Sequence, residues 1–352
     1  MPGTEFVLPQ SRFYLFGMGD RPKMVYRAGQ LLDAATAQPI ARWPIRNERI
    51  IPSEYRVEMT AADGGDLAIF EDEAGVWLDR AGRIEPIAQS KLTLPRFETF
   101  RHGALLRVLH HEVLISIVEG LPLPNSFVYR HLPPWRRDAA MMAMVLKITG
   151  NTSLLADWIG SLDSPFDRNN AGECEPDNLG QSLYLLSLIP GGGQHPLVEQ
   201  ILAEAEAGKV RRGSYIAGRS DFAEHPVYQT KWLKFGLASL KLDDFWQIPE
   251  IADSYSALFW MDYRDQHVPA GRFSPQHRQW YPYLAWAEAH FYNSPPPMDL
   301  ANSGYPMTWE ARASQADYEA MGWIDRAFVD GRICMPHSWH AAEMFLYLVE
   351  LE

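Results

Sequence analysis

The chain of 352 residues has only two cysteines, Cys174 and Cys334. They lie far apart in the sequence and match no metal-ligand spacing, which argues against a disulfide scaffold and favours free thiols. The chain also lacks the roughly 18 consecutive apolar residues that a membrane span needs. Its first residues lack the basic and apolar regions of a secretion signal. We therefore expect a cytoplasmic protein with no membrane partner.

Basic residues are scarce as well. The chain has 32 Lys and Arg against 44 Asp and Glu, a formal net charge of -12. Nucleic acids attract clustered basic residues, so nucleic acid is not an expected partner. The sequence has no phosphate-binding glycine loop, no dinucleotide fingerprint and no G-x-S-x-G elbow. We expect neither a cofactor nor a bound metal, and the oligomeric state stays open.

Aromatic residues are abundant in this chain. Trp, Tyr and Phe make up 12% of it, with 12 Trp alone. Flat rings stack well on the C–H faces of sugars and other amphipathic ligands. A Trp-rich core explains the same count without any function, so the composition leaves both explanations open.

The first third of the chain has the texture of β-structure. Short β-branched and aromatic runs alternate with glycine pairs such as Gly64-Gly65, and residues 104–120 continue the pattern. Prolines at 122, 124, 133 and 134 cannot lie inside regular elements and mark a junction. The sequence therefore predicts a β-rich N-terminal region over residues 1–122 and a helical catalytic domain over residues 123–352.

Helical patterns dominate the second region. A broad apolar stripe predicts a buried helix over residues 135–148, and Asn178 with Gln181 has the form of a capping box. Strands and helices do not alternate here, so a doubly wound sheet is disfavoured. The fold class we expect is mainly α, an (α/α) toroid of helical hairpins, complete or trimmed. The other predicted helices cover residues 196–207, 226–240, 249–262, 281–292, 309–323 and 339–351.

The stretch WRRD places three charged residues at the start of an otherwise apolar helix. Asp138 near a helix N-terminus is favoured by the dipole, and Arg136 or Arg137 can pair with it, which is a purely structural explanation. The alternative is that Arg137 and Asp138, beside Trp135, project into a cleft. There they would bind sugar hydroxyls through charge-assisted hydrogen bonds.

The densest polar cluster runs from residue 165 to residue 181. It includes Glu175 and Asp177 just before a strongly hydrophobic helix. A solvated acidic loop with capping residues accounts for these charges without function. The abundance of Asn, Asp, Gly and Gln instead suits the recognition of hydroxyl groups, with Asn178 and Gln181 as further binding residues.

Two later segments supply more acids and imidazoles. Glu310 follows Trp309, and the run PHSWH contains His337, Trp339 and His340 at the start of an apolar helix. A lone residue of these types is more often a core or surface group than a catalyst. The unusual composition of the run makes it a candidate part of the site.

Three stretches, WRRDAAMMAMVLKITGN, EPDNLGQSLYLLSL and PHSWHAAEMFLYL, resemble the six-hairpin glycosidases, a superfamily that includes glucoamylases and trehalases. The resemblance covers the chain from about residue 121 onward. It implies that Arg137 and Asp138 bind the sugar at the cleaved subsite. It also implies that Glu175 or Asp177 is the general acid and that Glu310 is the base.

The leading hypothesis is an inverting glycoside hydrolase, in which two carboxyl groups lie roughly 6.5–9.5 Å apart across the bond that is cleaved. One alternative is a sugar isomerase, epimerase or lyase that uses His337 or His340 with a tyrosine. Another is a carbohydrate-binding protein without catalysis. The predicted catalytic residues are Glu175, Asp177 and Glu310, and the predicted substrate-binding residues are Trp135, Arg137, Asp138, Asn178, Gln181, Trp309, His337 and Trp339.

Overall fold

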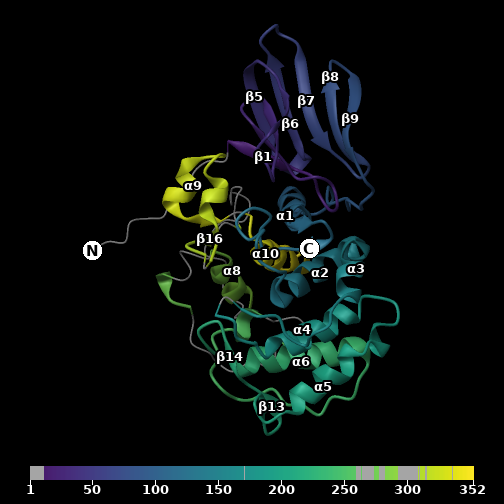
Figure 1. Cartoon of the computed structure of the whole chain (residues 1–352), viewed down its shortest axis with the longest axis vertical. Coiled ribbons are helices and arrows are strands. Elements are labelled where there is room, and N and C mark those ends of the chain that lie inside the picture. The colour runs from purple at the N-terminus through teal and green to yellow at the C-terminus, as the bar shows by residue number, and fades with distance from the viewer. Residues whose placement is uncertain are drawn as a thin grey trace, which may run out of the picture.

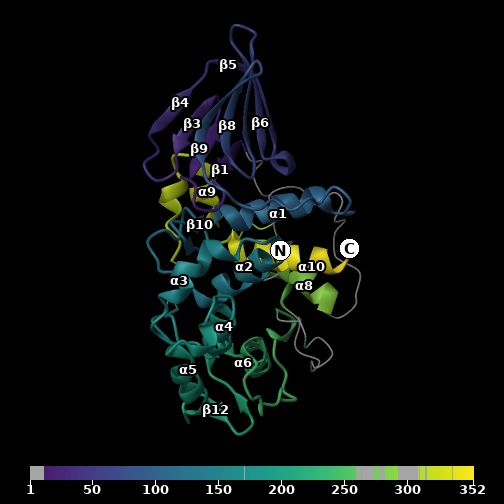
Figure 2. The same ribbon diagram turned by 90° about the vertical axis from the view of Figure 1, so that its right-hand side faces the viewer.

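The structure is a computed structural model in which sheets occupy one end of the molecule and helices the other (Figures 1 and 2). Of the residues described, 37% are helical and 21% lie in strands. The described residues are 12–169, 171–258, 263, 273–276, 282–291, 308, 310–313, 315–334 and 336–352.

The expected N-terminal β-structure forms two antiparallel sheets, in which each strand pairs with the next one along the chain. The first sheet consists of β1 (Phe13–Phe16), β2 (Met24–Arg27), β3 (Gln30–Asp33) and β4 (Pro39–Arg42). The second consists of β5 (Ile45–Ile51), β6 (Arg56–Ala61), β7 (Asp66–Glu71), β8 (Gly75–Arg80) and β9 (Arg83–Gln89). A short 3-10 helix, η1 (Pro52–Glu54), joins β5 to β6.

Strand β1 is buried on both faces. Tyr14 and Phe16 belong to the core between the two sheets, together with Ile69 of β7. Phe13 points to the opposite face, where its ring meets the edge of Phe328 at a centroid distance of 5.6 Å. Phe328 belongs to α9 (Arg326–Gly331), so a helix from the end of the chain covers the first sheet (Figure 1).

Helix α1 (Gly103–Ile115) occupies a segment that we expected to form a strand, and that expectation is wrong. We also expected its polar residues to face outward, yet His110, His111 and Glu112 are all buried. The helix packs between η1 and α10 (Ser338–Glu350). A helix covered on several sides shows no clear apolar period, and its β-branched residues therefore suggested a strand.

Several of the predicted helices of the second region are present. The helices that correspond to these predictions are α2 (Arg136–Thr149), α4 (Asp177–Leu186), α5 (Leu197–Glu206), α6 (Pro226–Leu240), α8 (Pro282–Phe291) and α10. Between them lie α3 (Ala156–Gly160) and the 3-10 helices η2 (Thr152–Leu155), η3 (Gly192–Gln194), η4 (Ser256–Leu258) and η5 (Tyr318–Met321). Two-residue strand pairs are β10 (Ile117–Val118) with β11 (Leu121–Pro122), β12 (Arg211–Arg212) with β13 (Tyr215–Ile216), β14 (Arg219–Ser220) with β15 (Ala223–Glu224), and β16 (Glu310–Ala311) with β17 (Ile333–Cys334).

The expected fold class, a mainly α toroid of helical hairpins, is wrong. The two sheets account for much of the regular structure, and α1, α10, α2, α4 and α6 pack one against the next in that order. The predicted helix over residues 309–323 is absent, because Glu310 and Ala311 pair with β17 instead. The described part of 249–262 contains only η4. Among the described residues, strand pairs and 3-10 turns therefore stand where the helical hairpins of a closed ring were expected.

Helices α4 and α6 approach each other unusually closely through two glycines. A Cβ on Gly180 would lie 2.1 Å from the carbonyl carbon of Trp232, and one on Gly236 would lie 2.4 Å from the Gly180 oxygen. Contacts this short exclude any side chain, so the crossing depends on glycine. Helix α4 also packs against α2.

The predicted capping box at Asn178 is also absent. Helix α4 begins at Asp177, and its N-cap residue, Pro176, makes no side-chain cap. Asn178 instead accepts a hydrogen bond from the Asp167 backbone and donates one to Gln181. Its amide therefore ties the preceding loop to the helix. No helix within the described ranges is long and apolar enough to cross a membrane.

Candidate active site

A cavity of about 450 Å³ lies where the first turns of α2 and α10 meet the loop before α4 and the β14–β15 hairpin. This volume is within the range of small-molecule sites. Its lining combines aromatic rings with acidic and imidazole groups. The lining residues are Tyr129, Trp135, Arg137, Asp138, Asp167, Asn169, Ala171, Glu175, Asn178, Asp221, Phe222, Tyr255, Phe273, Leu284, Glu310, His337, Trp339 and His340.

Most of the residues predicted from the sequence meet in this cavity. Asp177 and Gln181 do not line it and lie buried behind its wall. Trp309 lies outside the described residues. The predicted residues that line the cavity are Trp135, Arg137, Asp138, Glu175, Asn178, Glu310, His337 and Trp339.

Arg137 is the cationic centre of the site. Its guanidinium donates to Glu175 at 2.5 Å, to Asp177 at 3.0 Å and to Asp221 at 2.7 Å. Its charge also lies 5.4 Å from the centre of the Trp339 ring. Desolvation opposes the charge, but the three carboxylates, Asp177 first, raise the pKa of Arg137 well above its ordinary value. Arg137 is thus a fixed, permanently charged wall of the cavity.

Asp177 holds Arg137 from behind. Its Oδ2 accepts from Arg137 and from the Gln181 amide at 2.9 Å, and its Oδ1 accepts from the Ser220 hydroxyl at 2.6 Å. The side chain is fully buried. Asp177 and Gln181 therefore act on the cavity through the position of Arg137.

Glu175 lines the cavity but is strongly engaged. Its Oε1 accepts from the Asn169 amide at 2.8 Å and from the Asp221 backbone at 2.7 Å, while its Oε2 accepts from Arg137. Burial raises the pKa of Glu175 to about 7. The charge of Arg137 lowers this pKa, and the charges of Asp177 and Asp221 raise it.

His337 stands between two other carboxyl groups. Its Nδ1 lies 3.9 Å from Oδ1 of Asp138, and its Nε2 lies 3.0 Å from Oε2 of Glu310. The distance between Oδ1 of Asp138 and Oε2 of Glu310 therefore cannot exceed the sum of these two contacts and the distance between the two nitrogens of one imidazole ring. That distance stays within the roughly 9.5 Å upper limit for the carboxyl pair of an inverting glycosidase.

Burial controls the protonation of these three groups. Desolvation raises the pKa of Asp138 to about 7, and desolvation with the charge of Asp138 raises that of Glu310 to about 8. Desolvation also lowers the pKa of His337 to about 3. At neutral pH the imidazole is neutral and the carboxyl pair holds a proton, so the site contains a proton donor beside an acceptor.

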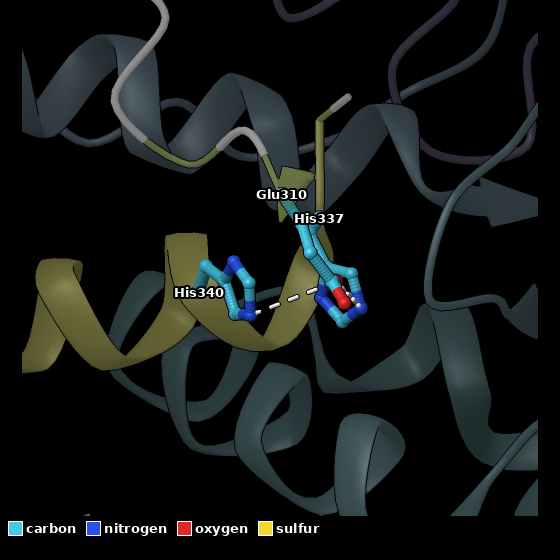
Figure 3. A group of neighbouring side chains, drawn as sticks. All are labelled: Glu310, His337 and His340. Carbon is cyan, nitrogen blue, oxygen red and sulfur yellow. Dashed lines mark ion pairs between the residues drawn. The ribbon is translucent and has the colours of Figure 1, made fainter. Parts of the chain in front are cut away.

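A metal-ligating group overlaps with this arrangement. The ligand atoms of Glu310, His337 and His340 all lie within 4.8 Å of one another, and all three residues are buried. The two imidazoles stack at a centroid distance of 4.2 Å at the start of α10, and Glu310 faces them from β16 (Figure 3). Sequence spacing alone gave no sign of this group.

Sequence reasoning missed Asp221, Phe222 and Tyr255. Asp221 and Phe222 form the tip of the β14–β15 hairpin, where Asp221 has a left-handed φ of 53°. Tyr255 donates its hydroxyl proton to Oδ2 of Asp221 at 2.8 Å. The one local signal is an aspartate in a tight turn before an aromatic residue, which many surface hairpins share.

Comparisons of the chain with protein-family models, with curated proteins and with solved structures give no match. The function is therefore argued from the cavity and the chemistry of its side chains.

Proposed function

We propose that this protein is a glycoside hydrolase that cleaves a carbohydrate bound in the cavity. The observation that carries the proposal is the pair Asp138 and Glu310, placed on the two ring nitrogens of His337 within one aromatic-lined cavity. A proton donor and a proton acceptor in one cavity are what glycosidic cleavage requires.

The wall of the cavity suits a sugar ring. Trp135, Phe222, Tyr255 and Trp339 present aromatic rings to it. Such rings pack against the apolar faces of sugars, while a fixed guanidinium and amides bind the hydroxyl groups at the edge. Arg137 is fixed in this way by its three carboxylates.

In the proposed reaction, one carboxyl group of the pair protonates the leaving oxygen as the glycosidic bond breaks. The other group removes a proton from a water molecule, which attacks the anomeric carbon from the opposite side. The anomeric configuration inverts. We assign proton donation to Glu310, whose pKa is the higher of the two, and water activation to Asp138, whose Oδ1 is buried without a hydrogen-bond partner among the described residues.

This assignment gives Glu175 and Asp177 a different role from the general acid expected from the sequence. Both accept hydrogen bonds from Arg137, and Asp177 does not reach the cavity. A carboxyl group that neutralises a buried cation is poorly available as a proton donor. We propose that these two residues position Arg137.

The test is a panel of α- and β-linked oligosaccharides, with NMR of the first-formed anomer. We expect Asp138→Asn and Glu310→Gln each to lower kcat by roughly 10²–10⁴-fold. Glu173→Gln, on an exposed side chain of the same loop, is the matched control and should retain activity. Binding without turnover by the unmodified protein would replace the proposal with a carbohydrate-binding protein. Isomerisation that survives Glu310→Gln but not His337→Ala would replace it with the His-based alternative.

A further inference from the structure

We propose that Glu310, His337 and His340 bind a divalent cation of the Zn²⁺ class in the wall of the cavity. Two imidazoles and one carboxylate form a donor set that suits borderline divalent metals. The closest pair of ligand atoms is 3.0 Å apart, and Glu310 Oε2 lies 3.9 Å from Nε2 of His340. Bond lengths of about 2.0–2.2 Å to zinc require ligand atoms roughly 3–4 Å apart, so the spacing of these atoms suits one ion. One of the two stacked rings must rotate for both ring nitrogens to point at it.

The backbone elements bring the side chains of the three ligands close together. His337 is the N-cap residue of α10 and His340 lies in its first turn, so their side chains share one face of the helix. Glu310 is held opposite by the pairing of β16 with β17, in which Glu310 pairs with Cys334. Figure 3 shows Glu310 beside His337, with a dashed line that marks its contact with His340. The backbone of each ligand is therefore held by a regular element, α10 for the two histidines and the β16–β17 pair for Glu310.

The groups behind the imidazoles orient them as a metal site requires. Ligating histidines usually direct the second ring nitrogen to a carbonyl or a carboxylate. Nδ1 of His340 lies 3.3 Å from the Thr308 carbonyl oxygen, which directs Nε2 toward Glu310. Thr308 is itself fixed, because its hydroxyl donates to Glu112 of α1 at 2.6 Å.

His337 follows the same pattern with a carboxylate. Its Nδ1 faces Oδ1 of Asp138, and neither atom has a hydrogen-bond partner among the described residues. A cation on Nε2 leaves the proton on Nδ1, where it points to Asp138. The arrangement is then a carboxylate–histidine–metal series.

The function of the cation rests on the proposed glycosidase activity, whereas the binding site does not. Three protein ligands leave a coordination position open toward the cavity that all three residues line. A water molecule bound there loses a proton to solvent, and the hydroxide attacks the anomeric carbon. The bond to the leaving oxygen breaks as that oxygen takes a proton from solvent. Glu310 then acts as a ligand, and solvent takes over its part as the proton donor.

The experiment is calorimetric titration of the chelator-treated full-length protein with Zn²⁺, and with Co²⁺ followed by visible absorption. We expect one ion per chain and the absorption bands of four-coordinate Co²⁺. His340→Gln and Glu310→Gln should each weaken binding at least 100-fold, and Asp138→Asn should weaken it about 10–100-fold. His195→Gln, at the C-cap residue of η3 and away from the cavity, is the control and should bind normally.

The absence of stoichiometric binding, or binding unchanged in all three variants, would overturn the metal site. Circular dichroism checks that each variant folds. If His340→Gln does not fold, the binding measured for Glu310→Gln, which preserves the shape of the side chain, tests the metal site. The two proposals fail separately. Hydrolysis that proceeds fully in metal-free protein leaves the glycosidase in place and removes the cation, whereas tight binding without hydrolysis supports the site and removes the glycosidase.

Discussion

Arg137 donates a 2.7 Å hydrogen bond to Asp221, a residue 84 positions later in the sequence. The first lies in the opening turn of α2 and the second at the tip of the β14–β15 hairpin. Tyr255 donates to the same oxygen of Asp221, and all three residues line the cavity. The hairpin and the loop around Tyr255 thereby share a single anchor.

Loss of the Asp221 charge should weaken ligand binding more than it slows chemistry. In Asp221→Asn an amide oxygen can still accept, but the Arg137 guanidinium loses one of its three counter-charges and the bond that anchors the hairpin tip is weakened. A hydrogen bond to a charged group is worth about 1.5–3 kcal/mol, so we expect KM or Kd to rise roughly tenfold or more with kcat little changed. Kinetics on the best panel substrate, or calorimetry with it, measures this. Asp244→Asn, in a partly buried pair with Lys234 away from the cavity, should change neither value.

Removal of the central cation should destabilise the fold. Arg137→Met leaves Glu175, Asp177 and Asp221 together without their counter-ion, and breaking a buried ion pair costs about 3–5 kcal/mol. The loss should be larger at pH 8 than at pH 5, because protonated carboxyl groups no longer need the cation. Urea unfolding at both pH values measures the loss in the free energy of unfolding. An equal loss at the two values would show that packing, not charge, is responsible, and Arg211→Met serves as the exposed control.

Glu112 should make the protein less stable as the pH rises. Desolvation raises its pKa in the folded protein to about 8, while its Oε2 accepts from Thr308. The folded state therefore binds more protons than the unfolded state between the ordinary pKa of 4.5 and about 8. The contribution of Glu112 to the free energy of unfolding is fully present below pH 4.5. It falls by about 1.4 kcal/mol per pH unit as the pH rises through that interval.

The variant Glu112→Gln keeps the shape of the side chain and cannot ionise. Its free energy of unfolding should vary less with pH over this interval than that of the unmodified protein, as denaturant titrations at several pH values would show. Glu199→Gln, on the exposed face of α5, should leave the profile unchanged. Parallel profiles for the Glu112→Gln variant and the unmodified protein would contradict the assigned protonation.

The close crossing of α4 and α6 should not tolerate a methyl group. In Gly180→Ala the new Cβ meets backbone atoms of Trp232, which cannot move aside as a side chain would. Overpacking typically costs about 1–3 kcal/mol, and we expect a loss at or above the upper end. Thermal unfolding measures it. Gly208→Ala, where no atom lies within 4 Å of the new Cβ, should stay within about 0.5 kcal/mol.

The sequence by itself determined the elements that carry clear local signals. Pro226 starts α6 as expected, and the apolar stripe after Trp135 forms α2, which ends at Gly150. Such signals act within one or two helical turns, so a short stretch of chain is enough to define them. For the same reason the sequence located Arg137 and Asp138 at a helix start, and located His337 at another.

Only the tertiary structure decided which of these pieces meet. It placed α1 as a buried helix where local composition favoured a strand, and it paired Glu310 with Cys334 where a helix was expected. It also brought Asp221 to Arg137. These outcomes depend on packing and pairing between distant segments, which compete with local propensity and leave no periodic trace in the sequence. The helix starts that frame the cavity were therefore local properties, and the carboxyl and imidazole groups became a site only through long-range contacts.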